Sequence, residues 1–118
     1  MTPASIPPPN KTSSSTALEA SRVVTPSTTT NQHLRCFSIT GFNTKATDQY
    51  IMVFDAAAVP ADGQVSPMVL TAYAGLPFSF SWEGGRLFAN GIAVCNSTTP
   101  ASKTIGSADC LFDINYRG

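Results

Sequence analysis

From residue 33 onward, most of the chain alternates between apolar and polar side chains with a period of two. The last run shows this best: apolar Cys110, Phe112, Ile114 and Tyr116 alternate with Leu111, Asp113 and Asn115. Because successive side chains of a strand point to opposite faces, this segment predicts a strand with one buried face.

Similar patterns predict further strands. Residues 49–55 contain Tyr-Ile-Met-Val-Phe, which is apolar on both faces as in a central strand. Residues 78–82 alternate cleanly and place three aromatic side chains on one face. The remaining strands are expected at residues 33–40, 68–74 and 87–96, with turns at Gly41–Lys45, Pro60–Gly63, Ala74-Gly75 and Glu83–Arg86.

Two finer predictions follow from the same pattern. Strict alternation along residues 33–40 places Phe37 and Ile39 on one face, and Leu34 and Cys36 on the other. In residues 87–96, Gly91 is a candidate β-bulge.

Six or seven short strands joined by turns favour an all-β fold, namely a small antiparallel β-sandwich or a jelly-roll-like body. An α+β fold is the alternative. It is disfavoured because no segment shows a convincing period of 3.6 residues.

The first 32 residues lack this alternation. Pro7-Pro8-Pro9 favours a local polyproline II conformation, and residues 1–16 have almost nothing to bury, which predicts disorder in isolation. Residues 17–24 can form a helical turn, and a short edge strand is expected at residues 22–25, ended by Pro26. The predicted division is an extended arm at 1–32 and a sandwich domain at 33–118.

Composition changes the picture in one respect. Hydrophobic residues make up 42% of the 118 residues, as in a globular protein, but charged residues only 12%, and the formal net charge is zero. Such low charge favours a surface covered by neighbouring molecules. A Thr-rich β protein kept soluble by its hydroxyls is the alternative. The basic residues are scattered, which argues against direct nucleic-acid binding: Lys11, Arg22, Arg35, Lys45, Arg86, Lys103 and Arg117.

Targeting signals and cysteines add two expectations. No apolar stretch is long enough to span a bilayer, and the N-terminus lacks the basic and apolar regions of a signal peptide, so we expect folding in the cytosol and no membrane partner. Three cysteines without a CxxC motif predict buried, reduced thiols, not a disulfide framework or a zinc site. A Cys95–Cys110 disulfide stays open, because these residues end and begin consecutive strands.

No residue pattern predicts catalysis, and we expect no enzyme activity and no catalytic, cofactor-binding or metal-binding residues. His33 is the single histidine and has no partner in the sequence. Asp109 and Asp113 lie four apart on one strand, whereas paired glycosidase acids usually come from facing strands. The aromatic residues Phe78, Phe80, Trp82 and Phe88 can form a sugar-stacking platform, but at a period of two they are more often core.

One longer segment is familiar. Residues 50–63, Tyr-Ile-Met-Val-Phe-Asp-Ala-Ala-Ala-Val-Pro-Ala-Asp-Gly, resemble the strand, Ala-rich corner, Pro and Gly of a group of small tailed-bacteriophage structural proteins. The order continues through Tyr73-Ala74-Gly75, Phe88–Val94, Ser97-Thr98-Thr99 and a final strand ending in Tyr116. The resemblance covers residues 34–117, and residues 1–16 lie outside it.

This resemblance implies a virion component. We expect a capsid decoration (cement) protein that stabilises the head shell, forms a symmetric homo-oligomer and contacts the major capsid protein or other virion proteins, in a virion assembled in the host cytoplasm. A neck, tail or fibre-attachment component is one alternative, and a carbohydrate-binding host-adhesion module is another. The adhesion module requires exposed aromatic residues, whereas decoration predicts that Phe78, Phe80 and Trp82 are buried.

Overall fold

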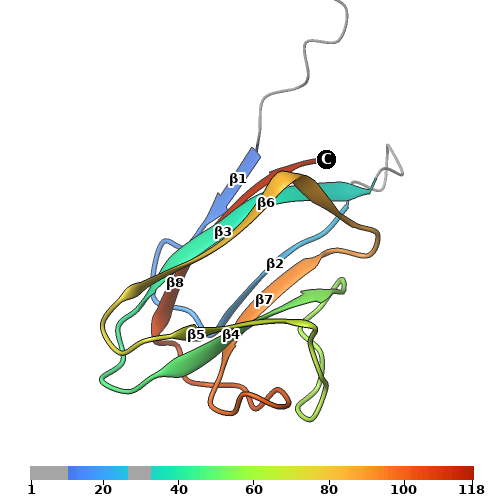
Figure 1. Cartoon of the computed structure of the whole chain (residues 1–118). Helices are drawn as coiled ribbons and strands as arrows, with labels where there is room; N and C mark the ends of the chain where they lie inside the picture. Colours follow the sequence, from blue (N-terminus) through green and yellow to red (C-terminus); the bar gives the residue numbers. More distant parts are fainter. Residues whose placement is uncertain (1–10, 27–32) are drawn as a thin grey trace, which may run out of the picture.

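Two four-stranded antiparallel sheets form the protein, as the computed structural model of residues 11–26 and 33–118 shows (Figure 1). The first sheet has the order β1 (Lys11–Ser14), β8 (Cys110–Arg117), β3 (Leu34–Asn43) and β6 (Pro77–Phe88). The second has the order β2 (Ser21–Val24), β7 (Ile92–Ser97), β4 (Gln49–Asp55) and β5 (Met68–Ala72). The predicted all-β antiparallel sandwich is therefore confirmed. Within these residues, no helix is long and apolar enough to cross a membrane.

The main core lies between the two sheets. On β8 the predicted inward face is the buried one, since Cys110, Phe112 and Ile114 are at most 1% exposed. The second sheet meets them with alternate residues of its two central strands: Ile51, Val53, Ile92 and Val94.

Strand β4 is apolar on both faces because both faces are covered. Ile51 and Val53 point into the main core. Met52 and Phe54 point to the other side of the sheet, where they form a second cluster. Ala56, from the connection that follows β4, packs against this cluster together with Val59, so the connection shields the outer face of the second sheet.

The face assignment along β3 was wrong in part. Leu34, Cys36 and Ile39 are all buried in the same cluster. The register against both neighbouring strands shifts between Cys36 and Ser38, so Phe37 is an extra residue that resets the alternation. The strand also continues through Asn43, and the turn expected to start at Gly41 starts after it.

The turn expected at Glu83–Arg86 is also absent, because β6 runs from Pro77 to Phe88. Its pairing with β3 skips from Ser81 to Arg86, so the intervening residues form a wide bulge. Gly84 and Gly85 adopt positive φ angles of 74° and 84° in this bulge. Glycine tolerates that conformation, which explains a turn-like sequence inside a strand.

The chain reversal lies further on, at residues 89–91, where the structure has a turn and not the strand bulge expected at Gly91. Both carboxylate oxygens of Asp55 accept hydrogen bonds there. The backbone N–H of Asn90 donates at 2.8 Å, that of Ala89 at 3.2 Å and that of Gly91 at 3.4 Å. One side chain at the end of β4 thus organises the passage from the first sheet to the second.

Residues 11–26 differ from the expected arm. Residues 11–14 form β1, which pairs with β8, and residues 21–24 form β2, which pairs with β7. Each sheet therefore gains an edge strand from this segment, and the helical turn expected at 17–24 is not formed. The short edge strand expected at residues 22–25 is found as β2, one residue earlier. Strand β1 was missed because an edge strand is held mainly by backbone hydrogen bonds and needs few apolar side chains. The predictions for residues 1–10 and 27–32 lie outside the described residues.

Candidate binding groove

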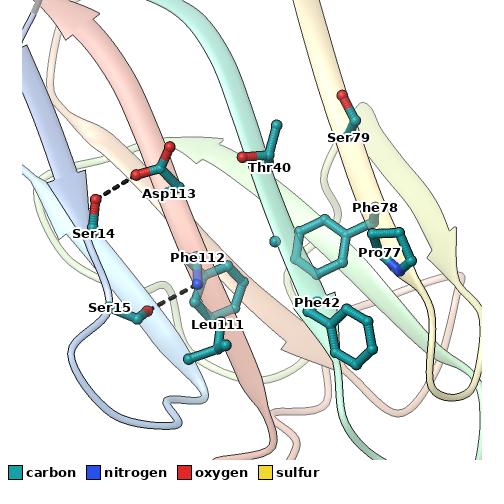
Figure 2. A pocket seen from close by; sticks show the side chains of 11 residues that line it. Ser14, Ser15, Thr40, Phe42, Pro77, Phe78, Ser79, Leu111, Phe112 and Asp113 are labelled. Atoms are coloured by element: carbon teal, nitrogen blue, oxygen red, sulfur yellow. Dashed lines mark hydrogen bonds between the residues drawn. The ribbon is translucent and has the colours of Figure 1, made fainter.

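A groove of about 470 Å³ lies on the outer face of the first sheet, where β1, β8, β3 and β6 run side by side (Figure 2). Strand pairing fixes which side chains meet there. The groove is lined by Ser14, Ser15, Thr40, Gly41, Phe42, Pro77, Phe78, Ser79, Leu111, Phe112 and Asp113.

One side of the groove is an apolar row. Leu111 of β8 lies opposite Phe42 of β3, and Phe42 lies opposite Pro77 of β6. Leu111 and Phe42 are 38% and 37% exposed. We call these three residues the apolar row. Because its members are adjacent, the row forms a continuous apolar strip on the surface, a feature that is found at interaction sites.

The other side is a polar row, two residues away from the apolar row on β8, β3 and β6. Asp113 pairs with Ser14 of β1 and with Thr40 of β3, and Thr40 pairs with Ser79 of β6. The Ser14 hydroxyl donates a hydrogen bond to the Asp113 carboxylate (Figure 2). Since hydroxyls both donate and accept, these four residues offer a hydrogen-bonding strip beside the apolar row.

Between the rows the lining is the backbone around Gly41. Its neighbours Phe112 and Phe78 point to the inner face, where their ring centroids lie 5.9 Å apart. A β-carbon at residue 41 would collide with the Phe78 ring and the Leu111 carbonyl oxygen. Glycine is therefore required at this position.

Ser14 and Ser15 form the wall of the groove on the β1 side, and a network of hydrogen bonds around Ser15 holds this wall in place. The Ser15 N–H donates to the Phe112 carbonyl at 2.8 Å, and the Phe112 N–H donates to the Ser15 hydroxyl at 2.8 Å. That hydroxyl donates to Glu19 Oε1 at 2.5 Å, and Arg22 Nη1 pairs with the same oxygen at 2.6 Å. Read from sequence alone, Ser13–Thr16 looked flexible, so this wall was missed.

The groove is suited to binding. Asp113 is its one charged side chain, and the remainder of the lining is apolar or hydroxyl-bearing. His33 is exposed and lies outside the lining. Asp109, the other acid considered with Asp113, precedes β8 and is also outside it.

The aromatic strand does not form an exposed platform. Phe78 and Phe88 are buried, while Phe80 and Trp82 are half-buried against the main core. The Phe80 and Trp82 rings stack with centroids 5.6 Å apart, and Trp82 meets Phe88 edge-on at 6.1 Å. The prediction that these aromatic residues belong to the core is confirmed, with Trp82 less buried than expected.

The three cysteines are free and buried. Cys36 and Cys110 belong to the main core, and Cys95 belongs to the second cluster. Burial raises the pKa of Cys36 and Cys110 to about 12 and that of Cys95 to about 11. Such thiols are neutral near pH 7 and poorly nucleophilic.

A buried amide network was also missed by sequence reasoning. Gln49 Nε2 donates to Asn43 Oδ1 at 2.9 Å, and Asn96 Nδ2 donates to Gln49 Oε1 at 2.6 Å. All three side chains are at most 1% exposed. They connect the end of β3, the start of β4 and β7, and they lie apart from the groove lining. Their role is therefore to fix the relative positions of these strands.

A polar contact between buried Lys103 and exposed Asp62 joins two loops. Lys103 is 3% exposed, and its Nζ lies 2.5 Å from Asp62 Oδ1. The Ile105 N–H donates to the same oxygen at 3.1 Å. The Lys103 hydrogen bond, followed by that of Ile105, holds the pKa of Asp62 below its usual value.

Comparison with known proteins adds one finding. No family model matches the chain, and no curated protein matches it. Among solved structures, the coat protein of tobacco streak virus aligns with a TM-score of 0.41 and 12% identity, over 97% of this chain and 91% of that one. An alignment at this score does not establish a shared function.

Proposed function

We propose that the protein is a structural component of a bacteriophage virion, and specifically a capsid decoration protein. The observation that carries this proposal is the apolar row, exposed on the outer face of a sheet in a chain of zero net charge with 12% charged residues. Exposed, adjacent apolar side chains mark interaction surfaces. The resemblance of residues 34–117 to small phage structural proteins supplies the type of partner.

The mechanism is mechanical. Many copies bind the outer shell through the first sheet, cover the apolar row and clamp adjacent capsomers. One small interface contributes little energy, but repetition on a symmetric lattice multiplies it. Binding is proposed in place of catalysis, because the described groove lining holds one carboxylate and no second acid or base to work with it.

Two alternatives use the same surface. A neck, tail or fibre-attachment component would present the apolar row to a different virion protein. A carbohydrate-binding module would use Phe42 as a stacking ring beside Asp113, but the aromatic strand first considered for that role faces the core.

The test is localisation. Particles of the virus that encodes the chain should contain many copies, visible as density on the outer shell in a reconstruction. Density confined to the neck or tail would replace decoration by the first alternative. Absence from purified particles, together with glycan binding that depends on Phe42, would favour the carbohydrate-binding module.

A deletion gives a second test of assembly. Removing residues 2–10 should lower particle occupancy and leave the sandwich folded, because β1 begins at Lys11. A deletion through residue 16 is unsuitable, since it removes β1 and Ser15. Unchanged occupancy after the shorter deletion would show that this segment plays no part in attachment.

A further inference from the structure

We propose that the groove binds the proline-rich segment Ile6–Pro9 of a second copy of the same chain. The inference concerns the protein before it binds a shell, when the apolar row is uncovered, and it does not depend on the virion role. Ile6-Pro7-Pro8-Pro9 is the only proline run in the sequence, and residues 1–10 carry no charged side chain.

The chemistry of the groove matches such a segment. A polyproline II stretch presents apolar rings and carbonyl oxygens, and its prolines have no N–H to donate. The apolar row offers contact for the rings. The hydroxyls of Thr40 and Ser79, in the adjacent polar row, can donate to the carbonyls. Apolar grooves with nearby donors are a recurring way of binding proline-rich segments.

The dimensions also agree. The apolar row crosses three neighbouring strands, a span of about 10 Å at the usual strand spacing. Three polyproline II residues extend about 9 Å. The groove volume of about 470 Å³ lies within the range of about 300–1,000 Å³ that is usual for ligand clefts.

The direction of β1 identifies the occupant as a second copy. Lys11 pairs with Tyr116, far from the groove, and Ser14 pairs with Asp113 in the groove lining. Strand β1 therefore runs toward the groove, and the residues before Lys11 start from its far end. Lys11 is held there, because its Nζ donates to the Gly118 carbonyl at 2.6 Å. Pro9 lies two residues before Lys11. A tight reversal takes four residues, so turning back toward the chain's own groove would consume the proline run itself.

Insertion of one chain into the groove of another is a heterologous contact. Such contacts repeat from copy to copy and build rings or open chains. The protein would then link its own copies laterally through the groove.

The test uses two differently labelled populations of the full chain. An Ala4→Cys variant carries a spin label, which should attach selectively because the three native cysteines are buried. It is mixed with ¹⁵N-labelled wild-type chain. We expect selective broadening of the amide signals of residues 40–42 and 111–113 in the mixture. Two results would overturn the proposal. One is broadening that occurs only when the spin label and the ¹⁵N label are on the same chain, and the other is no broadening at any protein concentration.

Two pairs of variants, followed by sedimentation, provide an independent measurement. Leu111→Lys should weaken self-association by about tenfold or more, because it places a charge in the apolar row. Leu87→Lys is the matched control, since Leu87 is 53% exposed on β6 and outside the groove. Replacing Pro7, Pro8 and Pro9 by Ser should have the same effect as Leu111→Lys, whereas Pro100→Ser should not. Equal association of all four variants would contradict the proposal.

Discussion

The ring of Phe78 occupies the space on the inner face of the first sheet that a side chain at Gly41 would need. The groove on the outer face and the core on the inner face therefore share one glycine. The close approach of β3 to β8 and β6 at this point depends on the missing β-carbon, since a β-carbon here would lie even closer to the Leu111 carbonyl oxygen than to the Phe78 ring.

Gly41→Ala should therefore destabilise the fold. The new methyl group must displace the Phe78 ring and the backbone of β8, and overpacking of this kind costs about 1–3 kcal/mol. Denaturant unfolding measures the loss. Thr40→Ala is the matched control, because Thr40 immediately precedes Gly41 on β3 and points outward. Equal stability of the two variants would show that the sheet adjusts freely at Gly41.

Trp82→Ala should cost less than the about 3–5 kcal/mol expected for a fully buried Trp, because Trp82 is only half-buried. The loss should still be measurable, since the indole stacks on Phe80 and meets Phe88. Tyr73→Ala, at a residue that is 58% exposed, should change stability by about 0.5 kcal/mol at most. A Trp82→Ala protein that melts like wild type would contradict the place of the indole in the core.

Gln49→Ala should be destabilising. It removes the amide that is hydrogen-bonded to Asn43 Oδ1 and Asn96 Nδ2, although Asn43 Oδ1 still accepts from the Lys45 N–H and Asn96 Nδ2 still donates to the Ser107 carbonyl. Each lost hydrogen bond costs about 0.5–1.5 kcal/mol, and the truncated side chain also leaves a cavity. Thermal unfolding compared with Asn90→Ala provides the measurement, because Asn90 is exposed in the 89–91 turn. A small loss, similar to that of the control, would mean that water enters and replaces the amide.

The cysteines predict a loss of stability at high pH. Burial raises the pKa of Cys36 to about 12, whereas an ordinary thiol ionises near 9.0. The neutral thiol therefore favours the folded state, and its contribution is complete below pH 9 and is lost as the pH rises toward 12. Cys95 and Cys110 act in the same direction. A variant with all three replaced by Ala should show a flatter decline of unfolding free energy between pH 9 and 11. An unchanged slope would assign the decline to other groups.

The Asp62–Lys103 contact shows how tertiary structure created features that the pattern did not predict. Lys103 lies in a Ser/Thr-rich loop, and Asp62 precedes a turn glycine, so each looks like a solvent-exposed loop residue. They are 41 residues apart in the sequence, and their pairing depends on two loops that are hydrogen-bonded to each other through the backbones of Gly63 and Lys103. A periodicity argument concerns neighbours along one element and cannot bring distant loops together.

The alternation along the chain was enough to predict the fold class, most of the strands and the inward face of β8, because a period of two directly reflects burial on one side of a strand. The sequence also indicated a central β4, since only a strand covered on both faces can be apolar throughout. The bulges in β3 and β6, the edge strand formed by residues 11–14 and the groove became visible only in the tertiary structure. These features depend on backbone hydrogen bonds and on the register between strands, which join residues as far apart as Ser14 and Asp113. Backbone hydrogen bonds and strand register do not produce a periodic pattern of side chains in the sequence.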